Sequence, residues 1–236
     1  MRTFLPALLA AAVLATPASA ATRNFGISGF DRIRVEGPFK VRLSTGVAPF
    51  ARASGTADAV DRLAVTVEGR TLVVRTQSAW GAGFPGQKYT PAEVEIGTHD
   101  LTSAWLNGAG TLKIDKVKGL SFDVSVQGSG AMGIGRADVD QLKIAVSGTA
   151  AAIVAGKAMR LTTTVRGISS LDAAALETKD AVVGAEGAAT VRAHVTNTVK
   201  VDASGPATIV LTGDPTCTAK LAGSASVSGC KPSSMR

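Results

Sequence analysis

The stretch LNGAGTL, residues 106–112, decides the fold because related stretches follow it at nearly constant intervals to the end of the chain. The later copies read VQGSGAM, VSGTAAAI, VRGISSL, AEGAATV, ASGPATI and LAGSASV. Their corner glycines are Gly108, Gly128, Gly148, Gly167, Gly187, Gly205 and Gly223. A fixed period of about 20 residues, as these glycines show, is typical of solenoids and other repeat arrays.

Between these glycines apolar and polar residues alternate, as at Phe122, Val124 and Val126, which predicts half-buried strands. Units of this length fit two architectures: parallel coils stacked as a β-solenoid, or antiparallel hairpins in a barrel or sandwich. Stacked coils require one residue type in one column, as the glycines provide. Hairpins require two turn signals in each unit, and only Asn107-Gly108 has that character. The sequence therefore predicts an all-β protein, a parallel β-helix or β-solenoid with coils of roughly 18–20 residues.

The rest of the chain divides by composition. Residues before the repeat alternate in the same way, for example Ile33 and Val35 against Arg32 and Arg34, and a Gly-Pro-rich segment separates them from the repeat. The predicted parts are a signal peptide at 1–20, a short N-terminal β region at 24–76, a Gly/aromatic loop at 77–91, the repetitive β-solenoid at 92–230 and a C-terminal tail at 231–236.

The segment at positions 1–20 has the composition of a secretory signal. Arg2 precedes a short apolar stretch, and Ala18-Ser19-Ala20 forms a small-residue cleavage site. No later segment offers an unbroken apolar run long enough to span a bilayer, so no transmembrane segment is predicted. We therefore expect an exported bacterial protein that is periplasmic, associated with the outer surface, or secreted.

Cys217 and Cys230 are the two cysteines of the chain. Export to an oxidising compartment favours a disulfide between them, and two free thiols are the alternative. Because the two residues flank the last repeat glycine, Gly223, their bond is expected to hold the terminal coil against fraying.

Two further stretches support a family resemblance. Residues 30–46 read FDRIRVEGPFKVRLSTG and residues 60–76 read VDRLAVTVEGRTLVVRT. Together with the signal and the glycine corners, the chain resembles the bacterial "putative autotransporter adhesin" head domain, the GIN family of unknown function, over about residues 25–230. The resemblance implies a parallel β-helix-like fold and a role in the envelope or at the surface. It supplies no catalytic residues.

The chain carries 25 Lys and Arg residues against 18 Asp and Glu, a formal net charge of +7. This balance permits loose binding to polyanions without requiring it. Charges on an exposed strand face ordinarily serve solvation, and contact with anionic cell-surface polymers is the alternative. Nucleic acid is disfavoured by the export signal. The two basic groups are Arg32, Arg34, Lys40 and Arg42 on the first strands, and Lys113, Lys116 and Lys118 in the repeat.

Patterns associated with enzymes are weak in this chain. The string GSGAMG at 128–133 matches a dinucleotide motif, but a strand follows it where that motif requires a helix. Asp138 and Asp140 fit a solvated turn better than a calcium site, and His99 and His194 have no zinc-ligand spacing. No G-x-S-x-G elbow occurs. We predict no catalytic residue, cofactor or metal; a polysaccharide lyase or hydrolase on a β-helix is the alternative.

The aromatic residues Trp80, Phe84, Tyr89 and Trp105 are the candidate ligand contacts. Rings in a Gly-Pro loop on a rigid β scaffold can stack on sugars or dock a partner. Covering an open end of the solenoid is the other role they could serve. The resulting expectation is a non-enzymatic envelope or surface β-solenoid with an adhesin-like binding or scaffold role toward a cell-surface glycan or an envelope protein.

Overall fold

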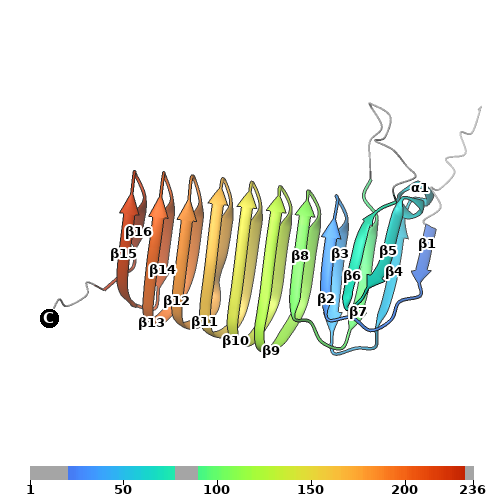
Figure 1. Ribbon diagram of the computed structural model, residues 1–236, viewed down its shortest axis with the longest axis horizontal. Coiled ribbons are helices and arrows are strands. Elements are labelled where there is room, and N and C mark those ends of the chain that lie inside the picture. The colour runs from blue at the N-terminus through green and yellow to red at the C-terminus, as the bar shows by residue number, and fades with distance from the viewer. Residues whose placement is uncertain (1–20, 78–89, 232–236) are drawn as a thin grey trace, which may run out of the picture.

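The structure, a computed structural model, describes residues 21–77 and 90–231. The signal peptide predicted at 1–20 lies outside these residues. The described chain is almost entirely β-strand (Figure 1). Its elements are β1 (Ala21–Phe25), β2 (Arg32–Glu36), β3 (Lys40–Thr45), β4 (Phe50–Gly55), α1 (Ala57–Asp61), β5 (Leu63–Glu68), β6 (Thr71–Thr76), β7 (Glu93–Thr98), β8 (Ser103–Gly108), β9 (Thr111–Gly128), β10 (Ala131–Gly148), β11 (Ala151–Gly167), β12 (Ser170–Glu186), β13 (Thr190–Ser204), β14 (Thr208–Thr212), β15 (Thr216–Ala222) and β16 (Ser226–Ser228).

The long strands β9 to β13 each make one flat coil. The first residues of β9 pair with β3, and its last residues pair with β8, so the strand runs along one face, bends and returns along the other. We call the first face A and the second face B. Neighbouring long strands pair in parallel. In Figure 1 the glycine turns lie at the top of the stack and the bends at the bottom. The parallel β-solenoid predicted from the repeat is confirmed.

Glycines form the turns between coils. Their φ angles are positive, from +110° at Gly108 to +72° at Gly223, a region that glycine enters without steric cost. A Cβ atom on Gly148 would lie 2.5 Å from the carbonyl oxygen of Gly128 in the preceding coil, so a larger residue would force the backbone to shift. The column also includes Gly37, whose backbone nitrogen lies 3.3 Å from the Cβ position of Gly108.

The core fills the space between the two faces. Alternate residues of each strand point inward, and equivalent positions of successive coils pair in register. Phe122, Leu142 and Leu161 form one such column, and each is fully buried. The same column continues through Ala181 and Val199, so smaller side chains fill it toward the C-terminal end.

The N-terminal strands extend the same stack in an order that differs from the sequence. On face B, β2 lies between β6 and β8 and pairs in parallel with both. On face A, β3 lies between β7 and β9 in the same way. The antiparallel strands β4 and β1 then extend face A beyond β7, and β5 extends face B beyond β6. The first coil of the sequence is therefore an inner coil of the structure.

The C-terminal end is closed by a covalent bond. Cys217 on β15 and Cys230 after β16 form the predicted disulfide, with Cα atoms 5.5 Å apart. The backbone nitrogen of Lys231 donates to the carbonyl oxygen of Pro215 at 3.0 Å, which adds a further link across this end. Within the two described ranges, no helix is long and apolar enough to cross a membrane.

Candidate functional site

Of the four predicted aromatic contacts, the structure describes Trp105. Trp80, Phe84 and Tyr89 lie outside the described residues. Trp105 is on β8 and projects from face B, because its neighbours Ala104 and Leu106 point into the core and are buried. Its side chain is half-buried in a flat sheet. Trp105 is therefore an aromatic surface held by a rigid strand.

The side chains around Trp105 are polar or small. Strand pairing places Arg34 of β2 on one side of Trp105 and Ser125 of β9 on the other. Asn107 and Gln127 are paired with each other on the same face, two positions further along their strands. We call these five residues the Trp105 patch. It combines one aromatic ring with amide, hydroxyl and guanidinium groups that can form hydrogen bonds.

Arg34 makes a direct contact with the ring. Its guanidinium carbon lies 5.8 Å from the centre of the Trp105 ring, within the range of a cation–π interaction. Ser103, two residues before Trp105 on the same face, is 5% exposed, and its hydroxyl has no hydrogen-bond partner among the described residues. The patch therefore holds a cation against its aromatic ring, whereas the Ser103 hydroxyl is buried beneath the surface.

Sequence reasoning did not place Arg34 beside Trp105. The signal was present, because Val35-Glu36-Gly37 has the same spacing of apolar residue and glycine as Leu106-Asn107-Gly108. Gly37 therefore belongs to the repeat, and aligning the two glycines aligns Arg34 with Trp105.

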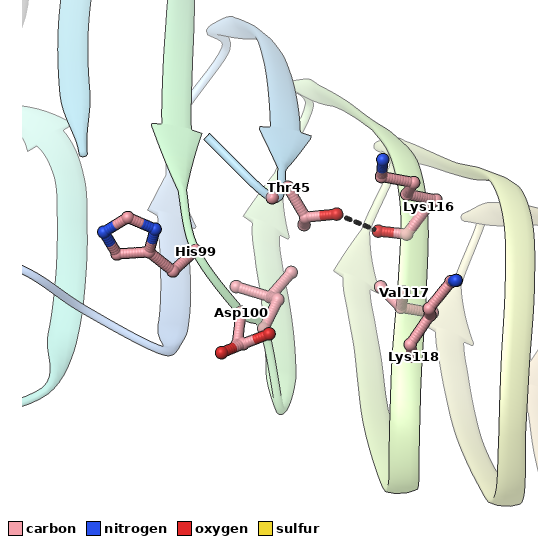
Figure 2. A pocket seen from close by; sticks show the side chains of 8 residues that line it. Thr45, His99, Asp100, Lys116, Val117 and Lys118 are labelled. Carbon is pink, nitrogen blue, oxygen red and sulfur yellow. Dashed lines mark hydrogen bonds between the residues drawn. The ribbon is translucent and has the colours of Figure 1, made fainter. Parts of the chain in front are cut away.

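A hollow lies at the bend edge, where the coil of β3 meets the coil of β9 (Figure 2). It encloses about 240 Å³ and includes Thr45, His99, Asp100, Lys116 and Lys118 in its lining. The Thr45 hydroxyl donates to the carbonyl oxygen of Lys116 at 2.8 Å. The His99 ring points away from the two lysines, so these groups do not converge on one point. This hollow has basic groups without the arrangement of an acid–base site.

The carboxylates considered for metal binding lie among lysines. In the strand register Asp138 lies between two lysines, Lys118 of β9 and Lys157 of β11. Lys157 forms an ion pair with Glu177 at 3.2 Å. A hollow of about 320 Å³ adjoins this row and also includes Asp140 in its lining. Within residues 21–77 and 90–231, no group of three His, Cys, Asp or Glu residues could hold a metal ion.

His194, the GSGAMG string and the carboxylate of Asp180 have structural roles in the stack of coils. The Nδ1 atom of His194 lies 3.0 Å from the hydroxyl oxygen of Thr212 on the next coil. Gly128 and Gly130 of the GSGAMG string lie in a coil turn, and strand β10 follows them. A hydrogen bond from the Thr198 hydroxyl, 2.5 Å away, lowers the pKa of Asp180 from its usual value, and Asn197 contributes a second one. These contacts link neighbouring coils.

Comparison with known proteins gives one family and several similar structures. The family model described as "Putative auto-transporter adhesin, head GIN domain" matches residues 29–215. A structure from Bacteroides fragilis NCTC 9343, described as a "putative adhesin", has a TM-score of 0.79 at 16% identity, covering 89% of this chain and 96% of its own. One from Parabacteroides distasonis ATCC 8503, described as a "putative lipid binding protein", has a TM-score of 0.69 at 21% identity, covering 88% and 95%. No curated protein matches in sequence. At these identities the structures share the fold.

Proposed function

Because the chain belongs to the family of the auto-transporter adhesin head GIN domain, we propose that it is an exported, non-enzymatic binding module of the cell envelope or surface. The family description and the similar structure from Bacteroides fragilis support an adhesin-like role. The disulfide is consistent with an oxidising compartment. The ligand class that best fits the surface is a cell-surface glycan.

The Trp105 patch carries this proposal. Sugars present apolar ring faces and hydroxyl groups together, so they suit an aromatic surface with polar neighbours. Trp105 offers the ring, while Asn107 and Gln127 offer amide donors and acceptors on the same face. Trp and Arg are also the residues that most often dominate binding energy. The strands fix the backbone positions of these residues before a ligand arrives, which reduces the entropy lost on binding.

Turnover of a polysaccharide is the competing function, and no finding favours it. A lyase or hydrolase needs a positioned acid, base or metal, but the Asp138 carboxylate lies opposite Lys118 and Lys157. In a screen for lyase and hydrolase activity we expect no turnover. Turnover that Asp138→Ala abolishes would contradict the binding proposal.

A glycan array with the purified protein tests the Trp105 patch directly. We expect Trp105→Ala to weaken binding of the best glycan by at least about tenfold, in line with the loss of an aromatic anchor. Trp105→Phe should retain part of the affinity because it keeps a ring. Val182→Ala, which truncates an exposed side chain of β12 on the same face, serves as the control. Equal binding by Trp105→Ala and the control would refute this placement of the site.

A further inference from the structure

Face A carries two like-charged pairs on neighbouring strands. Arg42 of β3 lies directly opposite Lys113 of β9, and Lys116 of β9 lies directly opposite Arg136 of β10. Like charges in this arrangement destabilise a sheet. We call these four residues the basic strip. Since β9 supplies both lysines, the strip runs along one strand toward the bend edge.

Carboxylates of β7 compensate Arg42 but not the rest of the basic strip. Glu95 lies directly opposite Arg42 in the pairing of β3 with β7, and Glu93 lies 3.8 Å from Arg42 but is shared with Lys40, at 3.6 Å. Asp115 is engaged by the backbone, because its Oδ1 accepts hydrogen bonds from the amides of Thr45 and Lys116 at 3.0 and 2.6 Å. The ion pairs of the described residues include none formed by Lys113, Lys116 or Arg136. The strip therefore has cationic groups that an anionic partner can satisfy.

The outer surface next to the strip is almost bare. Strand β10 places Gly133 opposite Lys113, and no atom lies within 4 Å of the position where a Cβ of Gly133 would be. Gly133 is not among the glycines with positive φ, so neither the backbone nor packing requires glycine here. On the far side of Gly133, Ile153 of β11 is 61% exposed. Strands β9 and β11 are about 10 Å apart, enough for one sugar chain.

We propose that the basic strip and the bare surface of β10 form a binding site for a polyanionic glycan chain. Sulfate, phosphate or carboxylate groups of the chain pair with Lys113, Lys116 and Arg136. The apolar side of a sugar ring rests against Ile153. The site lies on the face opposite the Trp105 patch and does not depend on it. Charge complementarity of this kind governs both partner choice and association rate.

Binding to dextran sulfate, with neutral dextran as the matched probe, tests the charge requirement. We expect the intact protein to bind dextran sulfate and not dextran, and added salt to weaken the binding. Lys113→Gln/Lys116→Gln should weaken it by at least about tenfold. Lys200→Gln/Lys220→Gln removes the same charge from face B and should leave it nearly unchanged. No binding by the intact protein, or equal losses in both double variants, would overturn the proposal.

A glycine substitution tests where the chain lies. Gly133→Gln fills the open surface without straining the backbone, and we expect it to weaken dextran sulfate binding by at least about tenfold. Gly184→Gln is the matched control, since Gly184 lies on face B, lacks a positive φ and has its nearest atom 3.6 Å from the Cβ position. Wild-type binding by Gly133→Gln would overturn this placement.

Binding to vesicles that contain phosphatidylglycerol distinguishes a glycan from a lipid surface. We expect the protein to bind dextran sulfate more tightly than these vesicles. Tighter binding to the vesicles that is lost in Lys113→Gln/Lys116→Gln would assign the strip to a lipid surface instead.

Discussion

At each end of the solenoid the terminal coil has a neighbouring coil on one side only. The chain covers the other side of these two coils by different means. At the N-terminal end, β4 and β1 add antiparallel strands to face A, β5 adds one to face B, and α1 buries Val60 against the core. At the C-terminal end, β15 and β16 simply continue the parallel stack, and many of their side chains are exposed, including Leu221 at 49%.

This difference indicates where each end takes its stability. A coil of a solenoid is supported mainly by its neighbour, so a terminal coil has about half the support of an inner one. The N-terminal end replaces the missing half with additional chain that buries Ala51 and Ala53. The C-terminal end depends on the Cys217–Cys230 bond. The comparison therefore predicts that the two ends respond differently to the same perturbation.

Reduction of the disulfide should have the largest effect. The bond spans 13 residues, and a loop of this size contributes roughly 3 kcal/mol through the entropy of the unfolded chain. We expect reductant to accelerate hydrogen exchange in β15 and β16 while β1 and β4 keep their protection. Cys217→Ser/Cys230→Ser should behave like the reduced protein without reductant. Unchanged protection of β15 and β16 on reduction would show that the last coil is held by packing alone.

An intermediate effect is expected at the glycine turns. Gly148→Ala places a Cβ close to the Gly128 carbonyl oxygen at a φ of +95°, and we expect it to lower the free energy of unfolding by about 1–3 kcal/mol. Gly133→Ala on the same strand meets open space and should change it by less than about 0.5 kcal/mol. Urea denaturation followed by circular dichroism compares the two. Similar values would mean that the glycine column is not what holds the coils in register.

The sequence predicted the C-terminal part of this fold better than the N-terminal part. From Gly108 onward each coil pairs with the coil that follows it in the chain, so the order of these strands can be predicted from the spacing of the corner glycines. The position of β2 between β6 and β8 depends on pairing between distant segments, which no local pattern specifies. Gly37 could have indicated this position, because it occupies the same corner as the seven repeat glycines. It lies far from them in the sequence, however, and outside their regular series.

The candidate site was predictable only in part. Residue type alone made Trp105 a candidate ligand contact and placed Lys113 and Lys116 in a candidate basic group. Their surroundings follow from register: Arg34 lies opposite Trp105, and Arg136 lies opposite Lys116, in the pairing of neighbouring strands. Residue type indicates what a side chain can bind, whereas the stacking of the coils determines which side chains act together.

The smallest effect concerns the contact between two inner coils at Asp180. The Thr198 hydroxyl on β13 lowers the pKa of this carboxyl on β12, so the folded state favours the carboxylate. The resulting stability is present above the pKa of the unfolded chain, near 4, and is lost as the pH falls through the lower folded value. We expect Thr198→Val to reduce the loss of unfolding free energy between pH 7 and pH 3, as measured by urea denaturation. Thr218→Val, a similar change on β15, should leave the pH dependence of the unfolding free energy unaltered. An equal change in this pH dependence in both variants would show that Asp180 is not its cause. Because Asp180 is only half-buried, solvent screens this interaction, and the effect should remain well below that of the disulfide.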